Sequence, residues 1–517
     1  MKAKKQLVFI MTDTTRFDML GCYGNKDMKT PYLDELANEG VLYEKAYTCQ
    51  PVCGPARGAI FTGLYPHANG SFTNCVPLWS GVKTVGEYLQ PNDIRCGYVG
   101  KWHLDGGDYF GNGVCPNGYE DKYWYDMKRY LDELTPEERL LSRKESTSLE
   151  NGGIKEEFTF AHRCSNRAVN FLEECSEEDF FLTVSYDEPH GPFLCPEPYA
   201  SMYKDYEMPR SENLYDKLED KPLLQKLWAG QNLHENKDEL KISPQLFLGC
   251  NSFVDYEIGR VLEAVKKYAP DAMVIYASDH GDALRSHSLT AKGPSVYEEI
   301  AHVPLIIKGG AYCEAPKNTS YKSVTSLIDI TPTILDYFDC YIPPVIQGKP
   351  MRPIIENPAN FDNSCDEKTF RDTVFLEFHR YEIDHDGFGG IQFMRACVTD
   401  THKMSVNLLD EVDELYDSVK DKAEMKNLIN DPSYSTIRKD LHKRILDFMN
   451  DTRDPYRGYQ WKVRPWNKDT EKPDWEVDYC TRQRPAGKGE LIQLDYDTGL
   501  EIKENIRHKF KANGVAG

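Results

Sequence analysis

The stretch PVCGPARGAIFTG, from Pro51 to Gly63, places a cysteine, a proline and an arginine at alternate positions. Cys53 precedes the rigid Pro55 by two residues and Arg57, whose side chain is always charged, by four. A lone cysteine is most often a small, buried structural residue. The alternative interpretation is a thiol that is converted into another reactive group.

Residue types that carry acid, base and metal chemistry follow four apolar runs of the sequence. They are Asp13, Lys101, His103, His190, Asp279 and His280, with His287 and Lys292 just beyond. Carboxylates are hard oxygen ligands for Ca²⁺, Mg²⁺ or Mn²⁺, and histidine and lysine carry protons and donate hydrogen bonds. Together these residues predict a divalent cation, a cationic cradle and general acids around a tetrahedral oxyanion.

The apolar runs themselves predict the elements that position these side chains. Runs rich in β-branched residues at 6–13, 93–103, 180–190, 272–282 and 303–309 are typical of strands buried on both faces. Helices are predicted between them at 31–39, with Thr30 as N-cap, at 251–268, and after Thr331. This alternation predicts a doubly wound α/β fold, in which ligands bind beyond the carboxyl ends of the strands.

The pattern changes after about residue 355. Residues 374–381 and 394–408 predict antiparallel strands, with a turn near Asp400, and 437–452 predict a helix. We therefore expect a large, mostly parallel sheet flanked by helices in an α/β domain at 1–355. A smaller α+β domain with an antiparallel sheet is expected at 356–517, ending in an extended tail beyond Asp454.

Composition excludes several classes of partner. The 517 residues carry a formal net charge of −21 at pH 7, which argues against nucleic acid or an anionic membrane. The run QLVFIM is too short for a secretory signal, and no stretch approaches the ~20 apolar residues of a membrane span. We therefore expect a cytoplasmic protein whose cysteines are reduced. The sequence does not indicate an oligomeric state.

Several motifs together resemble one family. CGPAR followed by GAIFTG resembles the sulfatase signature C-x-P-x-R-x-x-x-[LF]-T-G. TDTTRFDMLGCYGN resembles the N-terminal metal motif of that family, and GKWHL resembles its G-K-x-H-L element. YDEPHGPF, residues 278–307 and ELYDSVKDKAEMKNL resemble its later blocks. The resemblance covers most of the chain, is closest to a bacterial branch without signal peptides, and implies the fold of the alkaline phosphatase superfamily.

The resemblance implies a chemical role for Cys53. In sulfatases this cysteine is oxidised after translation to formylglycine (3-oxoalanine) by a formylglycine-generating or sulfatase-maturating enzyme. The hydrated aldehyde has two hydroxyls, one of which, activated by the metal, attacks the sulfur of a sulfate ester. The other then expels sulfate and restores the aldehyde, an exit that a serine would lack.

A metal shell is also implied, formed by Asp13, Cys53 as formylglycine, Asp279 and His280. Many relatives carry Asp-Asp where this chain has Asp13 and Thr14, so either Thr14 or a water is the expected further ligand. Ca²⁺ is the expected cation, with Mn²⁺ and Mg²⁺ as alternatives. His280 often aligns with asparagine in relatives, and an imidazole would shift the preference towards Mn²⁺.

The other roles follow from the same resemblance. Arg57 is expected to pair with the nucleophile and the metal-site charge, and Lys101 and Lys292 to hold the sulfate oxygens. His103 is expected to accept the proton that lets sulfate leave, and His190 to protonate the departing alcohol. Asn74 resembles an oxyanion-contacting asparagine of the related phosphonate monoester hydrolases.

The segment HRYEIDHDGFGG, 379–390, is polar and ends in glycines. It is either a surface hairpin loop or a substrate-selecting lid, with His379, Arg380 and His385 as candidate substrate contacts. The sequence thus predicts a sulfuric ester hydrolase that acts on a small sulfated substrate, such as a sulfated carbohydrate. Two alternatives stay open: a phosphonate monoester hydrolase or phosphodiesterase with the same nucleophile, and a non-catalytic binder with unmodified Cys53.

Overall fold

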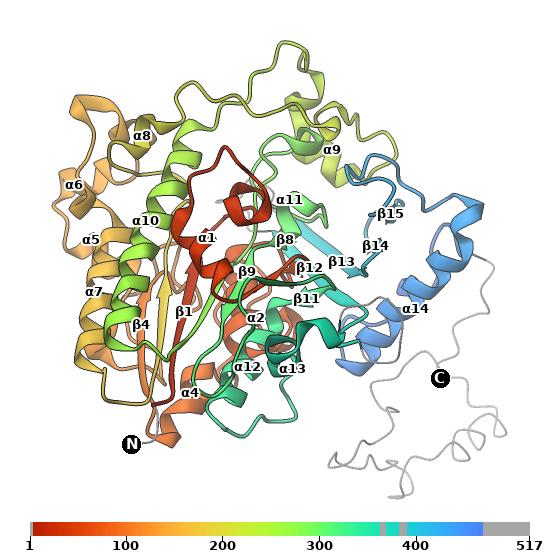
Figure 1. Ribbon diagram of the computed structural model, residues 1–517. Helices are drawn as coiled ribbons and strands as arrows, with labels where there is room; N and C mark the ends of the chain where they lie inside the picture. Colours follow the sequence, from red (N-terminus) through yellow and green to blue (C-terminus); the bar gives the residue numbers. More distant parts are fainter. Residues whose placement is uncertain (1–3, 362–368, 382–389, 469–517) are drawn as a thin grey trace, which may run out of the picture.

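A computed structural model describes residues 4–361, 369–381 and 390–468 (Figure 1). An eight-stranded sheet forms its centre, in the order β10-β2-β9-β7-β1-β6-β4-β5. All neighbouring pairs in it are parallel except the two that β9 makes with β2 and β7. The strands are β1 (Gln6–Thr12), β2 (Val41–Tyr43), β4 (Arg95–Gly100), β5 (Trp124–Tyr125), β6 (Phe180–Ser185), β7 (Met273–Ser278), β9 (Leu305–Lys308) and β10 (Thr319–Tyr321).

Both faces of this sheet are buried, as the continuous apolar runs predict. Alternate residues of β1 enter two separate apolar cores, with Val8 and Ile10 in one and Leu7 and Phe9 in the other. Helices α1 (Pro31–Asn38), α7 (Phe160–Glu174) and α10 (Gln245–Tyr268) cover the first face. Helices α2 (Cys53–Thr62), α4 (Val85–Leu89) and α12 (Ile330–Tyr337) cover the second. The doubly wound prediction is confirmed.

Shorter elements complete this part of the chain. A three-stranded sheet has the order β11-β3-β8, from β11 (Thr325–Ser326), β3 (Ala46–Tyr47) and β8 (His302–Val303). The remaining helices are α3 (Pro66–Asn69), α5 (Met127–Asp132), α6 (Pro136–Leu141), α8 (Tyr199–Met202), α9 (Leu223–Ala229), α11 (Glu298–Ala301) and α13 (Arg352–Glu356). Helix α10 begins six residues before the predicted 251, and α2 was not predicted as a helix.

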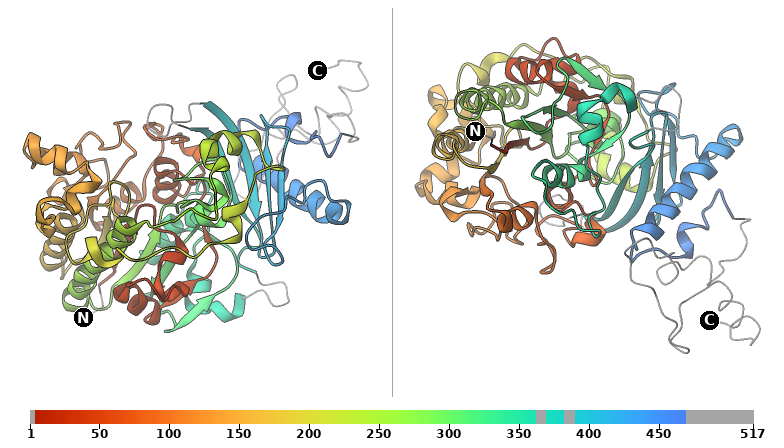
Figure 2. Two further views of the ribbon diagram at one scale, coloured as in Figure 1. Left: turned by 90° about the horizontal axis from the view of Figure 1, so that it is seen from above. Right: turned by 60° about the horizontal axis from the view of Figure 1, so that its bottom comes forward.

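A separate four-stranded antiparallel sheet lies beside the large one (Figure 2). Its strands are β12 (Val374–Tyr381), β13 (Gly390–Val398), β14 (His402–Asn407) and β15 (Glu414–Asp417). One face packs through Leu376 and Met394 against Tyr47 and Val296, and the other packs against α14 (Ser435–Asp451). The predicted antiparallel sheet is therefore confirmed, whereas the domain boundary between residues 355 and 356 stays a prediction.

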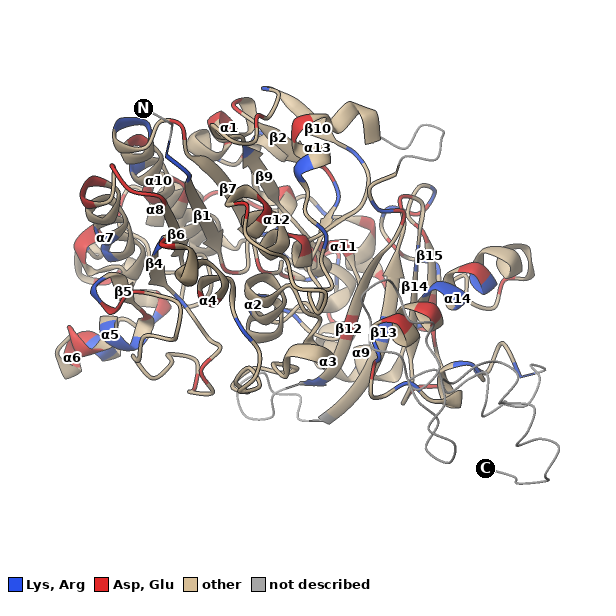
Figure 3. Cartoon of the chain, turned by 90° about the horizontal axis from the view of Figure 1, so that it is seen from below, with Lys and Arg blue, Asp and Glu red and all other residues tan. Residues whose placement is uncertain are grey.

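The charged residues are distributed as this packing requires. Figure 3 shows acidic and basic residues along outer helices such as α6, α7 and α14, with few on the central strands. Among residues 455–468, Trp461 is fully buried in an apolar cluster with residues of α14 and the antiparallel sheet, whereas the extended tail stays a prediction. Within the residues described, none of the helices combines the length and the apolar character needed to cross a membrane.

Candidate active site

Strands β4, β6, β1 and β7 are consecutive neighbours in the sheet and parallel, so their carboxyl ends lie side by side. Asp13 follows β1, Lys101 follows β4, and Asp279 follows β7. All three side chains are buried. The sheet order therefore gathers at one edge residues that are up to 266 positions apart, as strand ends of a doubly wound sheet do.

Cys53 is the first residue of helix α2, and the N-terminus of α2 points at this edge. Val52 before it is extended, and Pro55 stands in the first turn, where a missing backbone N–H costs no helical hydrogen bond. The side chain of Asn74 accepts a hydrogen bond of 2.9 Å from the backbone N–H of Gly54. This bond satisfies an otherwise unpaired amide of the first turn and fixes where Cys53 begins the helix.

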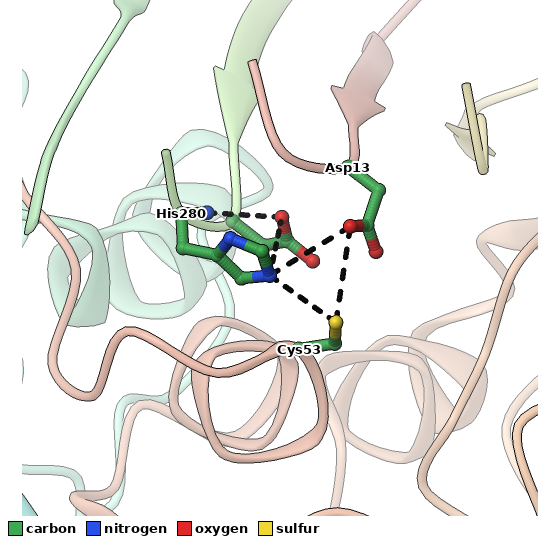
Figure 4. A group of neighbouring side chains, drawn as sticks. Asp13, Cys53 and His280 are labelled. Carbon is green, nitrogen blue, oxygen red and sulfur yellow. Dashed lines mark hydrogen bonds and ion pairs between the residues drawn. The ribbon is translucent and has the colours of Figure 1, made fainter. Parts of the chain in front are cut away.

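Four buried side chains, each with an atom that could bind a metal ion, lie close together and form the donor group of the site (Figure 4). Nε2 of His280 lies 3.2 Å from Sγ of Cys53, 3.7 Å from Oδ1 of Asp13 and 3.8 Å from Oδ1 of Asp279. Sγ of Cys53 lies 3.8 Å from the same Asp13 oxygen. These separations suit ligands that share one cation at the usual metal–oxygen and metal–nitrogen distances of about 2.0–2.6 Å. Two carboxylates, an imidazole and the side chain at position 53 therefore fit a divalent cation.

Arg57 holds the outer oxygens of both carboxylates. Its Nη2 and Nε each donate a hydrogen bond of 3.1 Å, to Oδ2 of Asp13 and to Oδ2 of Asp279. Its Nη1 donates to Ser185 Oγ and to the Lys101 carbonyl, both at 2.7 Å. The guanidinium is fully buried, so it turns the Oδ1 atoms of the two aspartates towards Cys53 and His280.

Thr14 lies next to the donor group with its backbone in the left-handed region, at φ 71°. Its hydroxyl donates a hydrogen bond of 2.7 Å to Oδ1 of Asp13, and its N–H lies 3.2 Å from Oδ1 of Asp279. Both contacts go to the carboxylate oxygens that face His280. In this arrangement Thr14 acts on the aspartates, and whether its oxygen also contacts a cation stays a prediction.

Two lysines and two histidines surround Cys53. Nζ of Lys101 lies 2.9 Å from Oδ2 of Asp13 and 4.0 Å from the Cys53 sulfur. Nζ of Lys292 lies 3.0 Å from Nε2 of His190. His103 is buried at φ 60°, and neither ring nitrogen has a hydrogen-bond partner among the residues described. Of these four residues only His190 is partly exposed, and the other three are buried, so the open side of the site lies next to His190.

Sequence patterns missed two residues here. Asp187 follows β6 and lies with Oδ1 3.0 Å from Nζ of Lys101. The hydroxyl of Tyr109 donates to that same oxygen and lies 2.9 Å from Nδ1 of His190. Asp187 has the strand-end position that identified Asp13, so the same rule could have found it. Tyr109 comes from a loop without periodicity, and nothing in the sequence marks it.

Burial and nearby charges together determine the pKa values of Asp13, Asp279 and His280. Burial acts to raise the pKa of Asp13, but Lys101 and the other nearby cations outweigh it and hold that pKa well below its ordinary value. Burial and then Asp13 raise the pKa of Asp279 to about 6. Burial acts to lower the pKa of His280, but Asp279 and Cys53 raise it to about 9. Cation binding would therefore displace a proton from this cluster.

The thiol itself is poised as an anion. Burial and Asp13 act to raise the pKa of Cys53, yet Lys101, Lys292 and His280 hold it well below the ordinary value. Burial lowers the pKa of His103, which keeps that ring neutral. A neutral ring with a lone pair is the form that accepts a proton.

Within the described part of the chain, three other groups of histidine and acidic residues differ from this one. In each group a basic side chain already pairs with one of the carboxylates: Arg395 binds Asp454, Arg260 binds Glu257, and Lys403 binds Glu424. His287 itself pairs with Asp216 at 2.7 Å, away from Cys53.

Of the predicted substrate contacts in the smaller sheet, the structure describes His379 and Arg380. His379 lies within β12 rather than in a loop, is 2% exposed, and its Nε2 accepts a hydrogen bond of 2.9 Å from Arg395. The strand pairing of β12 with β13 buries it, which the polar sequence around it did not indicate. Arg380 is exposed on the same strand. His385 lies outside the described residues.

Comparison with known proteins agrees with this geometry. Residues 5–340 match the family model described as Sulfatase, and residues 292–451 match the one described as N-sulphoglucosamine sulphohydrolase, C-terminal. The chain belongs to the sulfatase family. Sulfatases hydrolyse sulfate esters, and this chain is therefore an enzyme of that class. It is 40% identical over 98% of its length to the whole of a protein of Escherichia coli (strain K12) named uncharacterized sulfatase YidJ.

Solved structures share the fold of this sulfatase. One described as a complex with its substrate D-glucosamine-2-N,6-O-disulfate has a TM-score of 0.70 at 21% identity, over 90% of this chain and 100% of that one. The phosphonate monoester hydrolase of Agrobacterium radiobacter has a TM-score of 0.67 at 21% identity, over 87% and 96%. At this identity the likeness establishes the architecture, which both kinds of hydrolase share.

Proposed function

We propose that this sulfatase cleaves sulfate from a small sulfated carbohydrate through a formylglycine made from Cys53, with one divalent cation. The observation that carries the proposal is the position of Cys53. Its sulfur lies 3.2 Å from His280 and 3.8 Å from Asp13, inside a group of buried donors, at the N-terminus of a helix. A cysteine with a purely structural role does not require two carboxylates, an arginine and two lysines around it.

Asp13, Asp279, His280 and the modified residue 53 would hold the cation, for which Ca²⁺ is proposed ahead of Mn²⁺ and Mg²⁺. When bound, it supplies Lewis-acid activation of the nucleophile and neutralises sulfate charge. Maturation requires that a formylglycine-generating or sulfatase-maturating enzyme reach the segment around Cys53 before folding, because Cys53 is 1% exposed in the folded chain.

The chain's own residues would bind sulfate and move protons. Lys101, anchored between Asp13 and Asp187, and Lys292 would contact sulfate oxygens. Neutral His103 would take the proton from the hydroxyl of residue 53 that expels sulfate. His190, the most exposed of the group, would deliver a proton to the alcohol oxygen that leaves towards solvent. Asn74 would fix the helix start that presents residue 53.

The carbohydrate part of the proposal is supported by the substrate of the structural relative, a sulfated glucosamine. The second candidate, hydrolysis of phosphonate monoesters or phosphate diesters, is supported by the second relative. Parallel kcat/KM values for 4-nitrophenyl sulfate, a 4-nitrophenyl phosphonate monoester and a bis-4-nitrophenyl phosphate diester separate the two. We expect sulfate to be preferred by at least about 100-fold. A larger kcat/KM for either phosphorus ester would overturn the proposal.

A further inference from the structure

Tyr109 connects a carboxylate to a histidine of the site. Its hydroxyl donates a hydrogen bond to Oδ1 of Asp187, so the oxygen is left as an acceptor towards Nδ1 of His190, 2.9 Å away. The same nitrogen lies 3.0 Å from the carbonyl oxygen of Gly191. Two acceptors thus face Nδ1 and hold a proton there, so the proton that the ring takes up and gives away is the one on Nε2 of the imidazolium.

The opposite ring nitrogen of His190 points to the site. Its Nε2 lies 3.0 Å from Nζ of Lys292, and Lys292 is one of the cations that lower the pKa of Cys53. A proton delivered from Nε2 is therefore on the side of Lys292, the lysine proposed to contact the sulfate oxygens. A wrong ring orientation would put the proton on the far side of the ring.

The Oδ1 atom of Asp187 that contacts Tyr109 also contacts Lys101. Nζ of Lys101 lies 3.0 Å from Oδ1 of Asp187 and 4.0 Å from the centre of the Tyr109 ring. A cation at that distance from an aromatic face is attracted to it. Tyr109 and Asp187 thus contact both the lysine and the histidine, and both are buried.

Hydrogen bonds to Asp105 hold the loop that carries Tyr109 in place. The carboxylate of Asp105 accepts hydrogen bonds from the backbone N–H of Gly107, at 2.9 Å, and of Asn112, at 2.8 Å. Gly106 and Gly111 have φ values of 74° and 80°, which glycine adopts at little cost. These contacts close the loop on both sides of Tyr109, so its hydroxyl is held before substrate arrives.

We propose that Tyr109 and Asp187 are positioning residues for sulfate-ester cleavage: the Asp187–Tyr109 pair orients His190 as the proton donor to the leaving alcohol and anchors Lys101. This inference rests on the proposed function, because it needs a leaving alcohol. The tyrosine acts through the histidine and the lysine, and it does not touch the reacting atoms. The contacts run from carboxylate to hydroxyl to imidazole, and hydrogen-bond partners of this kind fix the orientation of a catalytic ring.

The test compares two esters that differ in their need for a proton. 4-Nitrophenolate leaves readily without protonation, whereas phenolate, a poorer leaving group, benefits more from it. We expect Tyr109→Phe to lower kcat/KM for phenyl sulfate by about 10- to 100-fold and for 4-nitrophenyl sulfate by at least about fivefold less. Equal losses on both esters, or no loss on either, would overturn the proposal.

Two further variants make the result decisive. Tyr125→Phe is the matched control, since Tyr125 is a buried tyrosine whose hydroxyl donates to the Glu133 carboxylate at 2.9 Å, outside the site. It should leave both rates unchanged. If Tyr109→Phe fails to fold, Asp187→Asn, which keeps the shape, must show the same difference between the two esters. An enzyme that prefers phosphorus esters would refute the proposed function but not this pairing, which is then tested with diesters of the same two phenols.

Discussion

The sulfur of Cys53 lies 3.2 Å from Nε2 of His280, and both side chains are buried. The contact joins the first residue of α2 to the second residue after β7. Nδ1 of His280 lies 2.8 Å from the carbonyl oxygen of Gly281. In the neutral ring that bond selects the tautomer with a lone pair on Nε2, directed at Cys53 and the two aspartates. One helix start and three strand ends thus build a single site.

Cys53→Ala should abolish sulfatase turnover while preserving the fold. Only the nucleophile is lost, so kcat should fall by at least about 10³-fold. The midpoint of thermal unfolding should move by no more than a few degrees, because the substitution removes a single sulfur atom and alanine is a strong helix former at the start of α2. Steady-state kinetics and circular dichroism check both statements. Persisting turnover would remove Cys53 from the mechanism.

Arg57→Met should destabilise the chain strongly. The substitution leaves the buried carboxylates of Asp13 and Asp279 without their shared cation, a cost of about 3–5 kcal/mol in the free energy of unfolding. Arg444→Met is the control, since Arg444 also pairs with two carboxylates but is one-third exposed. That change should cost about 0–1 kcal/mol. Urea unfolding measures both, and equal costs would contradict the role given to Arg57.

Asp279→Asn should lose the divalent cation without losing the fold. The amide keeps the shape of the side chain but lacks the anionic oxygen, so metal content should fall well below about one ion per chain. Asp187→Asn should retain the ion, because Asp187 contacts Lys101 and not the donor group. Metal analysis by mass spectrometry after dialysis compares the two. Equal metal content in both variants would exclude Asp279 as a ligand.

A buried pair that is not part of the Cys53 group should make stability depend on pH. Nδ1 of His67 lies 2.6 Å from Oε2 of Glu377. Burial acts to lower the pKa of His67, but Glu377 outweighs it and raises that pKa. Burial acts to raise the pKa of Glu377, but His67 and Arg395 hold it far below the ordinary value.

The two pKa shifts determine how stability changes with pH. The raised pKa of His67 stabilises the chain fully below about pH 6.5, and this contribution is lost as pH rises through the folded-state pKa. The lowered pKa of Glu377 stabilises above about pH 4.3, and this contribution is lost on acidification through its folded-state pKa. The destabilisation caused by His67→Gln should therefore be larger at pH 6 than at pH 9. A destabilisation that grows with pH would contradict the pairing.

Sequence patterns predicted the parts of the site that lie at strand ends. Asp13, Lys101 and Asp279 follow uninterrupted apolar runs, and the order of a parallel sheet brings such ends together. The helix that begins at Cys53 was missed, because glycine and proline at its start are typical of turns. Its first turn depends on the long-range contact between Asn74 and Gly54.

The surface position predicted for His379 is wrong for a different reason. Its polar neighbours indicated a loop at the surface, whereas pairing with β13 and a buried Arg395 place it in the core. Tyr109 was missed because a loop aromatic carries no periodic signal. In both cases the position depends on a partner that is distant in the sequence, and local pattern contains no information on it.

The most direct test of the account is the mass of the tryptic peptide AYTCQPVCGPAR, residues 46–57, from protein made in its native cells. Conversion of Cys53 to formylglycine lowers the mass by about 18 Da. Fragmentation should assign the change to Cys53, with Cys49 in the same peptide as the unmodified internal control. We expect the lighter peptide in active enzyme. An active preparation in which Cys53 is wholly unmodified would contradict it.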